Sequence, residues 1–269
     1  MIDLATGNGA VVEVALGMTG IENTGITCID SSSAAIENVE RRFPGISGIV
    51  ADALAVPLDD GGFDLATSQF GVEYAGSDAI YEAARLLATG GQLAMLLHVE
   101  GGSVYKECSD NLSAIRRLLE ANFIPLATEL FKTGFAAVRG ADRAPYDAAG
   151  RQLAPAVKEA EAIMGEFGEH VAGDTIVRLY SDVGSIHSQL PDYEPDEVLG
   201  WLDTMNDELS DFSGRMSSMT KAAMGQDTFE RVCQKLGEKG FTMRRAEPLT
   251  PEGQKLPLAW ALIASKQHT

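Results

Sequence analysis

The stretch Met-Ile-Asp-Leu-Ala-Thr-Gly-Asn-Gly-Ala, residues 1–10, decides the fold that this chain is expected to adopt. A short apolar run reaches the acidic side chain of Asp3, and two alternating glycines follow it. An apolar helical pattern then begins at residue 11. A strand, a glycine turn and a helix N-terminus in this order form a cradle for a nucleotide cofactor, because glycine lets the backbone approach a ligand closely. The stretch therefore predicts a cofactor-binding α/β domain.

The composition is that of an ordinary folded protein with an acidic surface. Of its 269 residues, 45% are apolar and 22% are charged, and the formal net charge is −18. Such a surface repels the phosphates of nucleic acids and anionic lipids, so we expect no nucleic-acid and no membrane partner. The three cysteines lie far apart without a CxxC pair, and no signal peptide or apolar run of ~20 residues is visible. These features favour a cytoplasmic protein without disulfides or a metal site.

Strand-like and helix-like segments alternate over residues 1–98. The expected strands and helices, in chain order, are a strand at 2–4, a helix from 11, a strand at 26–29, a helix at 31–42, strands at 46–50 and 63–68, a helix at 77–88 and a strand at 92–98. Gly90 and Gly91 are expected to close the helix at 77–88. This alternation indicates βαβ units and a parallel sheet with both faces covered.

The pattern becomes helical after residue 98. Apolar side chains recur at helical spacing, and loops are expected at 139–150 and 185–195. Several methionine and phenylalanine side chains share this spacing, which favours packing in a core over a substrate-binding role; they are Met164, Phe167, Met205 and Phe212.

An α/β pattern returns near the C-terminus. A helix is expected at 227–239 with Gly240 as its stop, and two strands follow at 241–246 and 258–264. Two closing strands joined by a short loop predict an antiparallel hairpin at a sheet edge.

The fold class expected from these segments is α/β. It comprises a three-layer Rossmann-like sheet, mostly parallel with an antiparallel C-terminal edge strand, and a mainly helical insertion. The core spans residues 1–98 and 225–269, and the insertion spans residues 99–224.

Residues 3–9 resemble the first motif of class I S-adenosylmethionine-dependent methyltransferases, which is an acidic residue followed by alternating glycines. Ala5 stands where the family often has its first glycine, which is a mild departure. The resemblance implies that Asp3 receives the amino group of the cofactor. It also implies that the backbone at Ala5, Gly7 and Gly9 lies against the cofactor.

Two further acidic positions follow in the order that the resemblance requires. Asp30, with Ser31 beside it, ends the second expected strand, where the family binds the ribose hydroxyls. Asp52 and Ala53 follow the third expected strand, where the family binds the adenine ring. The resemblance thus implies a ribose site and an adenine site.

Residues 63–70 resemble the fourth motif of the same family and place Gln69 and Phe70 at the end of the central strand. The motif here differs from the Asn/Asp-Pro-Pro-Tyr of methylases that act on amino groups of adenine or glutamine. The resemblance implies S-adenosylmethionine as cofactor, S-adenosylhomocysteine as product and a small or medium organic acceptor. The insertion would then be a substrate lid.

Two side chains are candidates for a catalytic base. Methyl transfer from a sulfonium is an in-line displacement, which needs alignment, sometimes a base and no metal. His98 ends the fifth strand of the expected core, and neutral histidine accepts a proton near pH 7, although a packed strand-end histidine is an equal interpretation. Glu73 is the second candidate, but an acid that starts a helix is the simpler interpretation of it.

Two other functions stay open. A dinucleotide-binding Rossmann oxidoreductase also has an acid about 20 residues after the glycines, but Val12 stands where its third small residue belongs. The other is a methyltransferase-like regulatory or partner subunit that does not methylate. Family members usually carry a helical segment before the first strand, whereas the first strand expected here begins at residue 2. We therefore expect the cofactor to be unusually exposed, or to be covered by the insertion or by a second subunit, as in a homodimer.

Overall fold

The computed structural model describes residues 1–18 and 25–267, which form two compact units. The α/β unit consists of Met1–Lys106 and Met219–Thr269, and the helical unit consists of Glu107–Ser218. The sequence places the corresponding boundaries at residues 98 and 224, a few residues away. The role of the helical insertion as a substrate lid stays a prediction.

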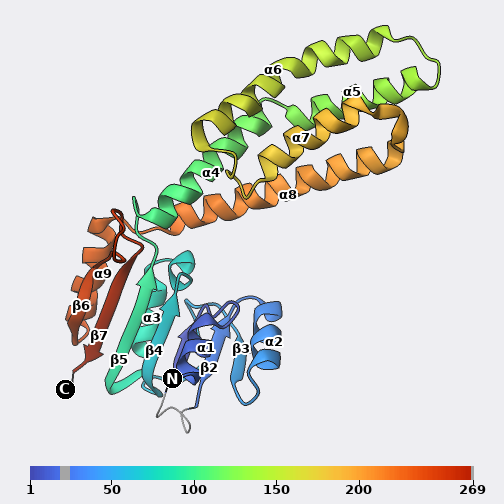
Figure 1. The fold of residues 1–269 in the computed structure, drawn as a ribbon. Coiled ribbons are helices and arrows are strands. Elements are labelled where there is room, and N and C mark those ends of the chain that lie inside the picture. The colour runs from blue at the N-terminus through green and yellow to red at the C-terminus, as the bar shows by residue number, and fades with distance from the viewer. Residues whose placement is uncertain (19–24, 268–269) are drawn as a thin grey trace. The chain divides into compact units, whose positions relative to one another are not determined.

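One sheet organises the described part of the α/β unit, with the strand order β3-β2-β1-β4-β5-β7-β6 (Figure 1). The strands are β1 (Ile2–Leu4), β2 (Thr27–Asp30), β3 (Ser47–Val50), β4 (Phe63–Gln69), β5 (Leu87–Leu97), β6 (Phe241–Leu249) and β7 (Ala259–Lys266). Neighbours among β1 to β5 pair in parallel, whereas β7 is antiparallel to both β5 and β6. The predicted sheet, mostly parallel and with an antiparallel C-terminal hairpin at its edge, is confirmed.

The chain reverses its direction of travel across the sheet between β1 and β4. From β1 it proceeds outward through β2 to β3, and it then returns to β4 on the other side of β1. In open α/β sheets, such a switch point leaves a crevice beyond the carboxyl ends of the two strands, where ligands bind. The ends of β1 and β4 are therefore where a site is expected.

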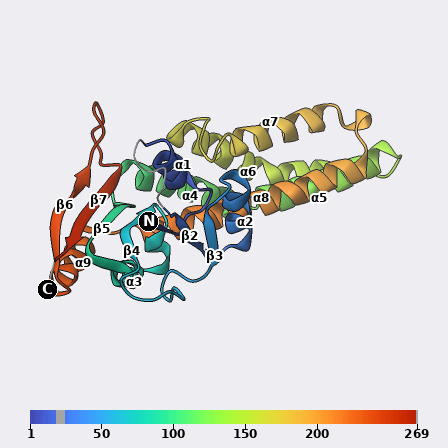
Figure 2. The same ribbon diagram turned by 90° about the horizontal axis from the view of Figure 1, so that it is seen from below.

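Helices cover both faces of this sheet. They are α1 (Ala10–Leu16), α2 (Ser33–Arg42), α3 (Asp78–Arg85) and α9 (Gln226–Glu238), with the short 3-10 turn η1 (Val72–Ala75) after β4. Apolar side chains of α1 and α2 share one buried cluster, and those of α3 and α9 share another on the opposite face. Figure 2 shows α3 and α9 on one side of the sheet and α1 on the other. These are the three layers that the sequence predicts.

The predicted helix stop at Gly90 and Gly91 is wrong. Helix α3 ends at Arg85, and both glycines lie inside β5. The register between β4 and β5 shifts nearby, and Gly90 has a left-handed φ of +82°. A Cβ on Gly91 would come within 2.9 Å of the Ala88 carbonyl oxygen, so the strand irregularity requires glycine there.

The helical unit contains long helices with shorter loops than the sequence predicts. Its helices are α4 (Ser103–Glu120), α5 (Phe123–Val138), α6 (Ala144–Phe167), α7 (Thr175–Ser188) and α8 (Pro195–Ala222), with the 3-10 turn η2 (Leu190–Asp192); α4 and α8 extend into the α/β unit. The predicted loops at 139–150 and 185–195 are wrong in their extents. Pro145 lies in the first turn of α6 and Pro195 begins α8, where the missing N–H costs nothing.

One apolar core holds the helical unit together. Met205 is buried in it, and Met164, Phe167 and Phe212 pack against it. The interpretation of these side chains as core is therefore confirmed. None of the helices within residues 1–18 and 25–267 combines the length and apolarity that crossing a membrane requires.

Trp260 on β7 links the sheet to the segment before α9. Its ring stacks on Phe229 with 4.3 Å between centroids, and its Nε1–H donates to the Met224 carbonyl oxygen at 2.8 Å. The N–H of Met224 donates in turn to the His98 carbonyl oxygen at 2.8 Å. Trp260 thus fixes the backbone beside the end of β5.

We expect Trp260→Phe to lower the free energy of unfolding by about 1 kcal/mol, because the stack is kept and one buried hydrogen bond is lost. Urea denaturation followed by circular dichroism measures this change. Trp201→Phe in the helical unit is the matched control. An equal loss in both variants would show that the hydrogen bond from Trp260 to Met224 adds no stability of its own.

Candidate functional site

The turn after β1 is built from strained and open backbone. Ala5 and Gly7 both have a φ of +52°, a left-handed value that costs alanine energy. A Cβ on Gly7 would meet nothing within 4 Å, whereas a Cβ on Gly9 would lie 2.9 Å from the Phe43 ring. Gly7 therefore leaves open space for a ligand, and Gly9 allows α1 to pack against α2.

The end of β4 meets this turn. Phe70 follows the strand with a left-handed φ of +54°, and its N–H donates to the Leu96 carbonyl oxygen at 2.8 Å. A Cβ on Gly71 would lie 2.7 Å from the Ala5 Cβ, so the two strand ends approach within contact distance. Left-handed non-glycine residues cluster at ligand sites in proteins, and here they mark both sides of the switch point.

Asp30 connects the glycine turn to α2. Its Oδ2 accepts from the Gly7 N–H and its Oδ1 accepts from the Ser32 N–H, both at 2.9 Å. Ser32 caps α2 by accepting from the Ala35 N–H at 3.3 Å. Each carboxylate oxygen keeps a second lone pair, so Asp30 can also accept hydrogen bonds from a ligand.

A cavity of about 390 Å³ opens at the carboxyl ends of these strands. Five of the predicted cofactor residues line it, namely Ala5, Asp30, Ser31, Asp52 and Ala53. Five others do not line it, namely Asp3, Gly7, Gly9, Gln69 and Phe70. The lining also includes residues outside the predicted set, which are Ile29, Ala51, Gly71, Tyr74 and Ala75. They adjoin strand ends or belong to η1, and no motif of the sequence singles out Ile29, Ala51 or Ala75.

Asp3 lies behind the turn, buried in the sheet. Its Oδ2 accepts from the Thr6 hydroxyl and its Oδ1 from the Thr67 hydroxyl, both at 2.7 Å. Burial raises the pKa of Asp3 from 3.8 to about 6, and the two hydroxyl hydrogen bonds oppose this rise. The contact of Asp3 with a cofactor amino group stays a prediction.

The two catalytic candidates come together at the ends of β4 and β5. Both the backbone N–H and the ring Nδ1 of His98 lie within hydrogen-bond distance of Glu73 Oε1, at 2.8 and 2.7 Å. Both side chains are buried. With Glu73 Oε1 as the acceptor of this contact, the ring proton lies on Nδ1, and Nε2 is the nitrogen left to accept a proton.

Aromatic rings surround the imidazole of His98. The Phe70 ring centroid lies 4.6 Å from it, and the Tyr74 ring meets it edge-on at 5.8 Å. Tyr74 also lines the cavity, so it connects the cavity to the Glu73–His98 pair. Glu73 Oε2 is buried and makes no hydrogen bond within the described residues. Glu73 is therefore no simple helix-starting acid, since its carboxylate orients a histidine.

Residues 1–91 match the methyltransferase domain family. The chain carries a class I methyltransferase domain. S-adenosylmethionine is the cofactor of this class of domain. The match begins at β1 and ends within β5, so it includes the glycine turn, Asp30 and Asp52.

Other methyltransferases are similar over part of the chain. An uncharacterized methyltransferase from Schizosaccharomyces pombe is 28% identical over 134 residues, which are 49% of this chain and 52% of that protein. The chain thus spans about half the length of this curated relative.

Two solved structures are similar to somewhat more than a third of the chain. A chain from the complex between the Haloferax volcanii Trm112 methyltransferase activator and a methyltransferase is 25% identical, with a TM-score of 0.34, and the match covers 36% of this chain and 44% of that one. An S-adenosylmethionine-dependent methyltransferase from Mesorhizobium loti is 21% identical, with a TM-score of 0.34, covering 39% and 47%.

The raised pKa of Asp3 predicts a pH dependence of stability for the methyltransferase domain. Between pH 3.8 and about 6, the folded state keeps a proton on Asp3 that the unfolded state releases. Stability therefore falls as pH rises through this range, by about 3 kcal/mol from this group alone.

We expect Asp3→Asn, which keeps the size of the side chain and removes its charge, to flatten this fall between pH 4 and pH 7. Urea denaturation at several pH values measures it. Asp64→Asn, at an exposed position on β4, is the control and should keep the wild-type slope. A wild-type slope in Asp3→Asn would show that the pH dependence of stability does not come from Asp3.

Proposed function

We propose that this chain is an enzyme that transfers the methyl group of S-adenosylmethionine to a small or medium organic acceptor. The observation that carries the proposal is the buried Glu73–His98 pair at the ends of β4 and β5. A base oriented by a carboxylate is the usual arrangement of a proton-accepting site. A subunit that only binds a partner has no need of such a pair.

The cavity residues fit the cofactor. Asp30 has free lone pairs for the two ribose hydroxyls, and Asp52 and Ala53 line the same cavity where the adenine ring would bind. Gly7 leaves open space at the turn. Two carboxylates on the cavity wall also attract a cationic ligand, since S-adenosylmethionine carries a sulfonium and an ammonium group.

The protein would contribute proximity and one proton acceptor to the reaction. When bound, S-adenosylmethionine supplies an activated methyl group. His98 Nε2 accepts the proton of the acceptor's O–H, N–H or S–H group as the acceptor bonds to the methyl carbon. Glu73 stabilises the imidazolium that forms, because its Oε1 lies 2.7 Å from Nδ1. S-adenosylhomocysteine is the other product.

Asp30→Ala should raise the dissociation constant for S-adenosylmethionine more than tenfold, because a charge-assisted pair of hydrogen bonds is lost. Calorimetry with S-adenosylmethionine, S-adenosylhomocysteine and NAD measures it, and the wild type should bind the first two and not NAD. Asp64→Ala, at an exposed position of β4 outside the cavity lining, is the control. Tight NAD binding would instead support a dinucleotide-binding protein.

His98→Gln should lower turnover at least a hundredfold and leave the dissociation constant for S-adenosylmethionine unchanged. Glu73→Gln should lower turnover less and shift the pH profile, because the amide cannot stabilise an imidazolium. Formation of S-adenosylhomocysteine with a panel of small alcohols, phenols, amines and thiols measures turnover. His170→Gln, at an exposed position of the helical unit, is the control.

Cofactor binding without turnover on any acceptor of the panel would favour the non-catalytic alternative. Full turnover in His98→Gln would remove this residue as the base.

A further inference from the structure

We infer that Arg85 is a positioning residue for the cofactor's adenosine half. It fixes the segment between β3 and β4, residues 51–62, which carries Asp52 and Ala53 to the cavity. Arg85 does not line the cavity itself. The inference rests on the proposed binding of S-adenosylmethionine.

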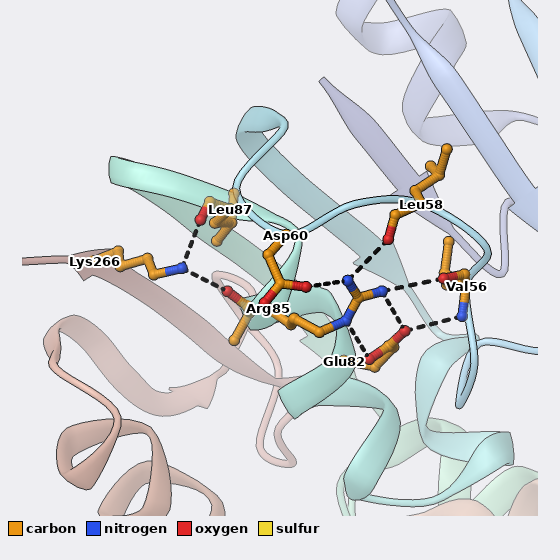
Figure 3. A network of polar contacts seen from close by, with 8 residues as sticks. Val56, Leu58, Asp60, Glu82, Arg85, Leu87 and Lys266 are labelled. Carbon is orange, nitrogen blue, oxygen red and sulfur yellow. Dashed lines mark hydrogen bonds and ion pairs between the residues drawn. The ribbon is translucent and has the colours of Figure 1, made fainter.

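The guanidinium of Arg85 uses all five of its N–H donors (Figure 3). Nε donates to Glu82 Oε2 at 2.9 Å, and Nη2 donates to Glu82 Oε1 at 2.8 Å. Nη2 also donates to the Val56 carbonyl oxygen at 3.1 Å. Nη1 donates to the Leu58 carbonyl oxygen at 2.8 Å and to Asp60 Oδ1 at 2.5 Å. Three of the five bonds therefore end on the segment.

Glu82 completes the attachment. Its Oε1 accepts from the Val56 N–H at 2.9 Å, so both backbone groups of Val56 are held by α3. The Arg85 carbonyl oxygen accepts from the Gly61 N–H at 3.1 Å and holds the far end of the segment. The hydrogen bonds between Arg85 and Glu82 raise the pKa of the first and lower that of the second, so both stay charged at neutral pH.

The other contacts that support the segment lie mainly at its cavity end. It forms no helix or strand, and its cavity end is held by a bond from the Ala51 N–H to the Asp30 carbonyl oxygen at 3.0 Å. Two local bonds to Asp52, from the N–H groups of Leu54 and Ala55, close a turn there. Val56 and Ala53 are both buried in the core cluster of the sheet. The position of Asp52 and Ala53 thus depends on these contacts at the cavity end together with the anchor at Val56, which Arg85 and Glu82 hold.

Lysine cannot replace Arg85 in this arrangement. An ammonium group has three donors around one nitrogen, and it cannot form the two parallel bonds to Glu82 while also reaching the carbonyl groups of Val56 and Leu58. We therefore expect Arg85→Lys to retain the charge and lose the positioning.

The test measures the binding of adenosine and of S-adenosylhomocysteine by calorimetry, well below the melting temperature of each variant. Arg85→Lys should weaken both ligands by the same factor, about tenfold, and Arg85→Ala should weaken both at least as much. The affinities should fall by equal factors because the segment would contact only the adenosine half, which both ligands contain. Arg245→Lys, which alters an exposed pair with Glu247 on β6, is the control and should bind as the wild type does.

Amide hydrogen exchange gives an independent readout. Arg85→Ala should speed exchange at Val56 and Leu58 and leave the amides of β1 and β5 unchanged, because the loss is local. Wild-type affinities for both ligands in Arg85→Lys and Arg85→Ala, a loss for S-adenosylhomocysteine without a loss for adenosine, or unchanged exchange at Val56 would overturn the inference. A wild-type protein that binds neither ligand would overturn the proposed function, whereas faster exchange in Arg85→Ala would still show that Arg85 fixes the segment.

Discussion

The hydroxyl groups of Thr6 and Thr67 both donate to the buried carboxylate of Asp3, and the rest of the site depends on these two bonds. One bond holds the glycine turn against the end of β1, and the other holds β1 against β4. Because β1 is only three residues long, few backbone bonds secure it at the centre of the sheet. A side chain that bridges the strand, the turn and the neighbouring strand compensates for this. The switch point where the site forms is therefore held by polar contacts as well as by packing.

The same carboxylate costs stability. Burial raises the pKa of Asp3 towards neutral pH, which means that the ionised form is poorly solvated in the fold. The cavity beyond it is lined by two more carboxylates, Asp30 and Asp52. Negative charge gathered in one place opposes folding and attracts a cationic ligand. A site of this kind loses stability when empty and is well suited to bind a ligand that carries positive charge.

Half of the residues predicted to bind the cofactor line the cavity, and these could be identified from the sequence. Asp30 and Asp52 are recognisable because each follows an apolar strand, and the carboxyl ends of parallel strands meet at one edge of a sheet. The role of Gly90 and Gly91 could not be predicted from the sequence, which indicated a helix stop where the structure has a strand. A pair of glycines after a helical pattern indicates a cap, and only the pairing of β5 with β4 shows that the glycines serve a strand irregularity. The hydrogen-bonded pairing of Glu73 with His98 could not be predicted either, because 25 residues separate them along the chain.

Taken alone, the sequence determined the order of strands and helices, the glycine turn and the acidic strand ends, since these depend on local spacing and on apolar periodicity. Only the tertiary structure decided which side chains act together. Ala5 and Phe70 adopt left-handed conformations because two strand ends meet at the switch point, and no local preference of alanine or phenylalanine predicts this. Arg85 reaches three of its five acceptors because helix α3 packs beside a segment whose contacting residues precede Arg85 by 25 to 29 positions in the chain. Contacts between distant residues form only when the whole sheet has assembled, and this is why the geometry of the site could not be read from its motifs.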